Sequence, residues 1–174
     1  SRGALLFPME DDQWILALGG RGDEVPPGDE AGFSNWARLL RTPTIFDAIS
    51  SAERVGDLDR YSFPKSVRRH FTRLPSFPSG LVPLGDAICV FNPLYGQGMS
   101  VAAQEAVLLR RLLGEGSDAV GMPPRLAADF FAEVESILET PWAMSALPDL
   151  VYPSATGDRP KDFAQTLQFG AAVT

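Results

Sequence analysis

The sequence predicts an α/β protein, or an α+β protein if its 174 residues are judged alone, and three features support this. Residues 3–20 have the pattern of a β-hairpin, because two apolar runs flank a polar turn and two glycines close the second run. Residues 99–113 and 124–138 show the helical spacing of apolar side chains. Short apolar segments lie between them, and we expect extended structure at residues 54–63, 66–74, 81–84 and 87–91.

Composition excludes several classes of protein. Apolar residues make up 45% and charged residues 21%, which is the balance of a globular protein. The net charge of −7 argues against a nucleic-acid partner, and one Cys with one His excludes a disulfide framework and a Cys/His zinc site. No apolar run approaches 18 residues and no export signal is visible, so we expect no transmembrane segment and a cytoplasmic location.

Four helices are expected from apolar spacing and from proline and glycine positions. Two short ones lie at residues 33–40 and 44–52. Residues 99–113 form the third, ending near Gly114, with Glu105 among its polar positions. Its predicted buried stripe is Ala102, Ala106, Leu109 and Leu113, with Val101, Leu108 and Leu112 at its flanks.

The fourth helix should begin at Pro124 and stop before Pro141, because proline suits the first turn and breaks the interior. We expect the chain from Trp142 onward to wrap over the surface. The predicted buried stripe of this helix is Leu126, Phe130, Val134, Ile137 and Leu138.

A dense basic patch lies at residues 65–73. It is either the solvated face of a strand or a site for an anionic group such as a nucleotide phosphate. His70 lies within it, and no orienting partner is near in sequence. The basic side chains of the patch are Lys65, Arg68, Arg69, His70 and Arg73.

The segment most typical of chemistry is residues 85–100. Asp86 follows an apolar strand, where a carboxylate can accept hydrogen bonds from hydroxyl groups. Gly96 and Gly98 leave the first N–H groups of the next helix open, which favours an anion or a carbonyl oxygen there. The pattern indicates a hydroxylated ligand with an electron-rich ring. Taken alone, Gly-Asp is also typical of an ordinary turn and Gly-x-Gly of an ordinary loop. The segment does not form a Gly-x-Gly-x-x-Gly fingerprint, because Val101 stands at the position of the third glycine.

Taken together, the segment resembles the second FAD-binding motif of the flavoprotein monooxygenases related to the aromatic hydroxylases, the ubiquinone-biosynthesis hydroxylases and squalene epoxidase. Their pattern is Gly-Asp-Ala-x-(His)-x-x-x-Pro-x-x-Gly-x-Gly. The matching positions here are Gly85, Asp86, Ala87, Pro93, Gly96 and Gly98.

The resemblance implies a role for each matched part. Asp86 would bind a ribityl hydroxyl of FAD, and Pro93 would lie beside the flavin ring. The backbone of residues 96–99 would face the pyrimidine edge, where negative charge gathers on reduction. The expected cofactor-binding residues are Gly85, Asp86, Pro93, Gly96, Gln97, Gly98 and Met99, and no catalytic side chain or metal ligand is assigned.

Two positions depart from the family pattern. Cys89 stands where His is common, and Ser100 stands where Asn often follows the glycine pair. We expect Cys89 to be a small buried apolar residue rather than a reactive thiol. Residues 92–99 are closer to the squalene-epoxidase-like branch than to the phenol hydroxylases. The two departures leave the substrate class undecided, but they do not affect the expected cofactor.

The family's Rossmann unit, which binds the ADP half of FAD, has no counterpart in these residues. We therefore expect the chain to be the C-terminal half of a longer flavoenzyme, with a Gly-x-Gly-x-x-Gly element upstream and that N-terminal half as its partner. The resemblance assigns residues 1–75 to the later part of a substrate domain. It assigns residues 76–118 to the FAD-binding domain and residues 119–174 to a C-terminal helix and tail.

The expected function is that of an FAD-dependent monooxygenase that hydroxylates or epoxidises a hydrophobic small molecule, with NAD(P)H as the reductant. Aromatic residues in the first 50 positions weakly favour such a substrate, although core packing explains them equally well. Two alternatives remain: an FAD-dependent reductase or dehydrogenase of the same fold, and a non-catalytic domain that binds a partner.

Overall fold

The computed structural model describes residues 2–114 and 125–165, which fall into two compact units divided between Ser62 and Phe63. Helices and small antiparallel sheets are mixed, which confirms the predicted class, α+β for the chain taken alone. The boundary at Ser62 reflects compactness within this chain. The assignment of residues 1–75, 76–118 and 119–174 to parts of a larger protein stays a prediction. No helix among the described residues is long and apolar enough to cross a membrane.

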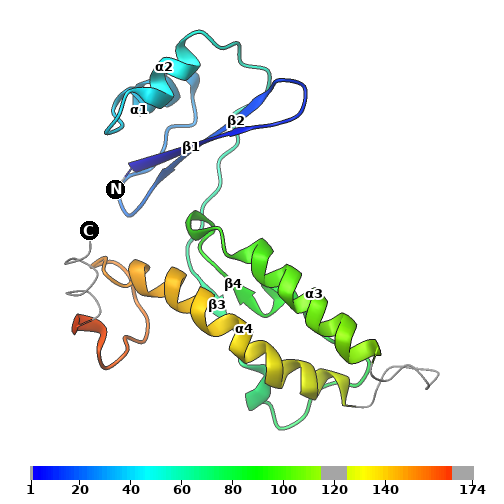
Figure 1. Cartoon of the computed structure of the whole chain (residues 1–174). Coiled ribbons are helices and arrows are strands. Elements are labelled where there is room, and N and C mark those ends of the chain that lie inside the picture. The colour runs from blue at the N-terminus through cyan, green and yellow to red at the C-terminus, as the bar shows by residue number, and fades with distance from the viewer. Residues whose placement is uncertain (1, 115–124, 166–174) are drawn as a thin grey trace. The chain divides into compact units, whose positions relative to one another are not determined.

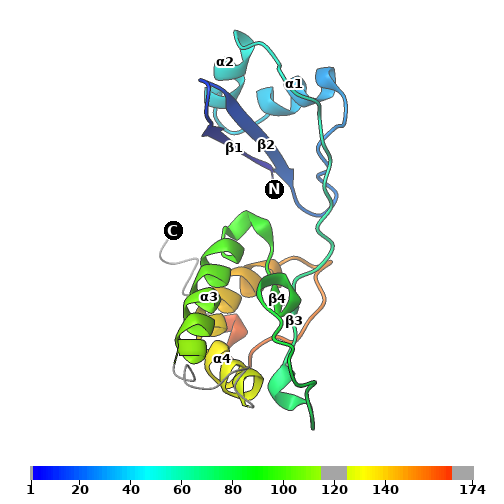
Figure 2. The same cartoon turned by 90° about the vertical axis from the view of Figure 1, so that its right-hand side faces the viewer.

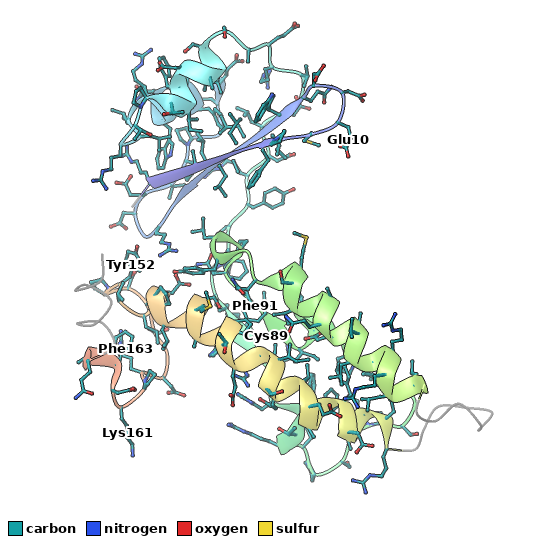
Figure 3. All side chains as sticks on the ribbon, in the orientation of Figure 1. Glu10, Cys89, Phe91, Tyr152, Lys161 and Phe163 are labelled. Carbon is teal, nitrogen blue, oxygen red and sulfur yellow. The ribbon has the colours of Figure 1, made fainter. Side chains whose placement is uncertain are left out.

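The first unit is a β-hairpin with two short helices, as the sequence predicts (Figure 1). Strands β1 and β2 pair antiparallel from Arg2 opposite Gly20 to Pro8 opposite Trp14. Glu10 lies at the tip of the hairpin (Figure 3). The elements are β1 (Arg2–Pro8), β2 (Trp14–Gly20), α1 (Glu30–Arg38) and α2 (Thr44–Ser50).

Helix α1 begins three residues earlier than the apolar spacing predicts. Asp29 caps it, since its carboxylate accepts a hydrogen bond from the Gly32 amide at 2.8 Å. The helix buries Trp36 and Ala37. The Arg2 guanidinium lies over the Trp36 ring, 4.5 Å from its centroid, and so joins the hairpin to the helix.

The second unit is built on two long antiparallel helices, which run side by side in both views (Figures 1 and 2). A two-stranded sheet packs beside them, with Val67 opposite Val90 and Arg68 opposite Cys89. The regular elements are β3 (Val67–Arg68), β4 (Cys89–Val90), α3 (Gly98–Gly114) and α4 (Leu126–Asp149), with single 3₁₀ turns at Phe71–Arg73, Gly85–Ala87 and Pro93–Tyr95.

The core of this unit lies where α3, α4 and the β4 segment meet. Phe130 and Leu138 of α4 are almost fully buried, as are Ile88 and Cys89 beside them. Figure 3 shows Cys89 and Phe91 next to the two helices. The rest of the buried cluster is Phe91, Val101, Leu108, Leu112, Leu126, Phe131 and Val134.

The predicted stripe of α3 is wrong by one position. The helix buries Val101, Leu108 and Leu112, whereas Leu113 is 44% exposed. The true stripe also contains Glu105, which is completely buried although it was assigned to the polar face. The prediction failed because the buried stripe contains the charged Glu105, whereas the neighbouring face carries Ala102 and Ala106 and so has the more apolar sequence pattern.

The predicted end of α4 at Pro141 is also wrong. The helix continues to Asp149, with Pro141 and Pro148 inside it, so the expected surface tail does not begin at Trp142. Packing offsets the hydrogen bond that Pro141 removes, because Trp142 packs against the core and Ser145 is fully buried. The Ser145 hydroxyl donates to the Pro141 carbonyl oxygen at 2.7 Å. Pro124, the predicted start, lies outside the described residues.

The extended segments are shorter than predicted. Within residues 54–91, all of which the structure describes, only β3 and β4 are strands, and each has two residues. Residues 81–84 form no strand, and Pro83 has no N–H to give to one. Residues 54–63 are likewise irregular, and the predicted extended segment at 66–74 turns into a 3₁₀ helix at Phe71.

The basic patch is engaged with the fold rather than simply solvated. Glu135 of α4 forms an ion pair with Arg68 and lies 3.4 Å from Nδ1 of His70. The Thr72 hydroxyl donates to the same carboxylate at 3.3 Å. Glu135 is therefore the orienting partner of His70 that is not visible nearby in the sequence, and it connects the segment around β3 to α4.

Glu135 should make the stability of the second unit depend on acid. Partial burial acts to raise its pKa, but the hydrogen bond and charge of Arg68, with a smaller effect of His70, hold the pKa below its usual 4.5. A lowered folded pKa stabilises the fold above pH 4.5, and that stability is lost as the pH falls through the folded value. We expect Glu135→Gln to cost about 1–2 kcal/mol in unfolding free energy at neutral pH.

Chemical denaturation between pH 7 and pH 3 measures this effect. The difference in unfolding free energy between wild type and Glu135→Gln should become smaller below pH 4.5. Glu133→Gln is the matched control on the same helix, where both partners of the ion pair with Arg111 are about half exposed, so it should change little. A difference that stays constant with pH would contradict this account of Glu135.

Candidate functional site

The turn that carries Asp86 is a single 3₁₀ turn at Gly85–Ala87, placed before strand β4. The prediction that Asp86 follows an apolar strand is therefore wrong, because residues 81–84 form no strand and β4 begins only at Cys89. Gly85 has a φ of +55°, a conformation that favours glycine. A Cβ at Gly85 would lie 3.9 Å from that of Ala102, so the turn lies against the start of α3.

Protein groups occupy the backbone of this turn from two sides. The Gly85 amide donates to Oε2 of Glu105 at 2.5 Å. Nη1 of Arg69 donates to the carbonyl oxygens of Asp86 and Ala87 at 3.0 and 3.3 Å. The Asp86 side chain is exposed, and its carboxylate has no hydrogen bond or ion pair within residues 2–114 and 125–165. The turn is thus held through its backbone, while the Asp86 carboxylate is exposed.

The loop after β4 is held by the far end of α4. Asn92 Nδ2 donates to one oxygen of Asp149 at 2.8 Å, and the Tyr95 hydroxyl donates to the other at 3.1 Å. The Asn92 side chain also accepts from the Leu94 amide and so caps the 3₁₀ turn at Pro93–Tyr95. The continuation of α4 past Pro141 is what places Asp149 beneath this loop.

The two glycines of the segment form an open edge at the start of α3. Gly96 has a φ of +64°, which explains its identity, and a Cβ at Gly96 or Gly98 would meet no atom within 4 Å. The first backbone bond of the helix runs from the Val101 amide to the Gln97 carbonyl oxygen at 3.1 Å. The N–H groups at residues 98–100 therefore precede the helical ladder, and the Met99 side chain is 88% exposed.

The remaining predicted site residues lie along the same segment. Pro93 is exposed at the start of its 3₁₀ turn. The Gln97 side chain is engaged within the loop, because its Nε2 donates to the Tyr95 carbonyl oxygen at 2.9 Å. This part of the described structure thus has an exposed carboxylate, an open glycine edge and helical N–H groups without a backbone acceptor, which fits a ligand carrying both hydroxyl groups and carbonyl oxygens.

Glu105 is the residue near this segment that sequence reasoning missed. Burial raises its pKa, the Gly85 amide acts in the opposite direction, and the nearby charge of Asp86 raises the pKa further. Its other oxygen, Oε1, has no hydrogen-bond partner in the part of the chain that the structure describes. The available signal was the spacing of Val101, Leu108 and Leu112, which places residue 105 on the same face.

A shallow apolar groove runs along another face of α3 and α4. Ala103, Val107 and Ile137 contribute to its lining, and none of the predicted cofactor-binding residues does. The groove is therefore distinct from the candidate site.

Comparison with known proteins identifies the family. A family model described as squalene epoxidase matches residues 25–122, which is more than half of the chain. The chain therefore belongs to the squalene epoxidase family. It is also 32% identical over 158 residues to Protein Rv3254 of Mycobacterium tuberculosis (strain ATCC 25618 / H37Rv), an alignment that covers 91% of this chain and 33% of that protein. The chain thus spans about a third of the length of this curated relative.

Cys89 should be inert in the folded protein. It is 1% exposed, as expected of a small apolar residue, and burial raises the pKa of its thiol to about 12. Ellman's reagent should therefore leave the native chain unmodified at pH 8 and should titrate one thiol per chain in denaturant, because the chain has a single cysteine. Rapid labelling of the native protein would show that the β4 segment is open to solvent.

Proposed function

We propose that the chain is part of an FAD-dependent monooxygenase, and that residues 85–99 hold the ribityl and isoalloxazine end of the cofactor. The observation that carries this is the exposed carboxylate of Asp86, which has no partner among the described residues. It lies on a fixed turn against the start of α3, where the N–H groups at residues 98–100 precede the helical ladder beside the open glycine edge. Membership of the squalene epoxidase family supports the same reading.

Each group has a chemical role in this proposal. The Asp86 carboxylate accepts a hydrogen bond from a ribityl hydroxyl. The open backbone at Gly96 and Gly98 lets the ring approach closely, and the N–H groups at the start of α3 meet the pyrimidine edge, aided by the helix dipole. Pro93 borders the ring, while Gln97 shapes the loop through its bond to Tyr95.

Bound FAD would supply the redox chemistry by which molecular oxygen gives one atom to a substrate. This chain's contribution is to bind the cofactor, to orient it and to limit the access of water, and no side chain is proposed as an acid or a base. NAD(P)H is the proposed reductant. A purified complete protein that absorbs near 450 nm and consumes oxygen while forming a hydroxylated or epoxidised product would support the proposal. Substrate reduction without oxygen consumption would favour a reductase.

A hydrophobic small molecule is the proposed substrate class. Leu5, Phe7 and Ile15 lie on one face of the β1–β2 hairpin, and each is about half exposed. An exposed apolar sheet face of this kind suits contact with an apolar ligand or with further parts of the protein. Product analysis with apolar candidate substrates tests this proposal.

Asp86→Ala should weaken FAD binding by about 1.5–3 kcal/mol, the range for a hydrogen bond to a charged group, which is roughly a tenfold to hundredfold loss of affinity. Asp86→Asn should be milder, because an amide oxygen still accepts. The melting temperature should hardly change, since the carboxylate of Asp86 is exposed and packs no core. Titration of FAD into the apo form of the complete protein, together with thermal melts, measures both quantities.

The matched control is Asp129→Ala, which removes another exposed carboxylate of the second unit and should leave FAD affinity unchanged. Residues 1–174 alone should bind FAD only weakly, because the proposed grip on the adenosine and pyrophosphate lies elsewhere in the complete protein. An FAD affinity that is unchanged in Asp86→Ala would contradict the proposal that this segment binds the flavin.

A further inference from the structure

Glu105 is a charged side chain in the core of the second unit that the proposed cofactor contacts do not use. It is 0% exposed and lies between Val101 and Leu108 on the buried face of α3. Burial of a carboxylate is costly, and a well-packed apolar residue at such a position is often neutral or stabilising. The packing of the apolar core therefore gives by itself no reason for a carboxylate at this position.

The contact of Glu105 shows what it does instead. Its Oε2 accepts the Gly85 amide at 2.5 Å, while Oε1 lacks a partner among the described residues. Gly85 adopts its positive φ at this point and is followed directly by Asp86. Arg69 binds the carbonyl oxygens on the other side of the turn. The peptide that orients Asp86 is thus fixed from both sides by charged groups distant in sequence.

We propose that Glu105 is a positioning residue for the cofactor: its buried carboxylate fixes the Gly85–Ala87 turn so that the Asp86 carboxylate is already oriented toward the ribityl hydroxyl before the ligand arrives. This inference rests on the proposed function. It adds a residue that touches no cofactor atom and acts through the Gly85 amide. Preorganisation of this kind raises affinity because the turn loses little freedom when the ligand binds.

A positioning role and a purely structural role predict opposite results for an apolar replacement. Leu has a similar volume and removes the buried charge, so Glu105→Leu should leave the fold as stable as wild type or more stable. It also frees the Gly85 amide, so the turn should become mobile and FAD affinity should fall. A structural role predicts the reverse: lower stability, with affinity unchanged well below the melting temperature.

The experiment compares Glu105→Leu and Glu105→Gln with wild type in the complete protein. FAD titration of the apo forms, thermal melts and amide hydrogen exchange over residues 84–88 are measured together. We expect Glu105→Leu to raise the dissociation constant roughly tenfold, with an unchanged or higher melting temperature and faster exchange at Gly85. Glu105→Gln keeps an acceptor for that amide and should stay within about threefold of wild type. Gln104→Leu, a control at the adjacent position on the exposed face of α3, should change neither the FAD affinity, nor the melting temperature, nor the amide exchange.

The outcomes separate this proposal from the proposed function. If wild type binds no FAD, the proposed function fails, and the positioning role fails with it. If wild type binds FAD and Glu105→Leu binds it equally well, only the positioning role is overturned. A Glu105→Leu protein that melts lower or does not fold also overturns it, because the hydrogen bond would then serve the fold itself. Loss of affinity at full stability, rescued by Gln, supports it.

Discussion

The packing of α3 against α4 is the contact on which the candidate site depends. Val101, Leu108 and Leu112 of α3 join the apolar face of α4 and the β4 segment in one buried cluster, and this helix–helix contact, the seam, forms the core of the second unit. Because α3 begins at Gly98, the same seam determines where its exposed N–H groups lie. The position of the candidate site is therefore set by the packed core and not by a loop that folds independently of it.

Two acidic residues far along the chain hold the two ends of the segment. Glu105 binds the backbone of the turn that carries Asp86, and Asp149 binds the side chains of Asn92 and Tyr95. Glu105 lies on α3 and Asp149 lies on α4, so the packing of these two helices fixes the positions of both ends of the segment. The segment thus makes its structural bonds inside the protein, while the Asp86 carboxylate and the N–H groups at residues 98–100 take no part in those bonds, as the proposed preorganised site requires.

The sequence predicted the parts of this structure that depend on local chemistry. The hairpin follows from alternating apolar runs and a polar turn, and α3 follows from a regular apolar spacing that ends at Gly114. The glycine edge was predicted because Gly96 and Gly98 have no side chains at the place where the first N–H groups of α3 point outward. The positive φ of Gly96 and the open space at Gly98 agree with that reason.

The remaining features depend on tertiary packing, which local pattern does not contain. Pro141 should end a helix, yet Trp142 packs against the core, Ser145 is buried, and α4 continues to Asp149. Glu105 was assigned to the surface because carboxylates are rarely buried, and its partner Gly85 is 20 residues away. The bond from Arg68 to Glu135 spans 67 residues, so the basic patch could not be assigned from its neighbours in sequence.

Hydrogen exchange of the complete protein with and without FAD is the most direct test of the central claim, that residues 85–100 are the surface that meets the cofactor. We expect FAD to slow amide exchange at residues 98–100, where the N–H groups precede the helical ladder of α3. Exchange in the middle of α4 should stay the same, because its backbone is already bonded within the helix. Bound FAD with no change in exchange over residues 85–100 would contradict the account.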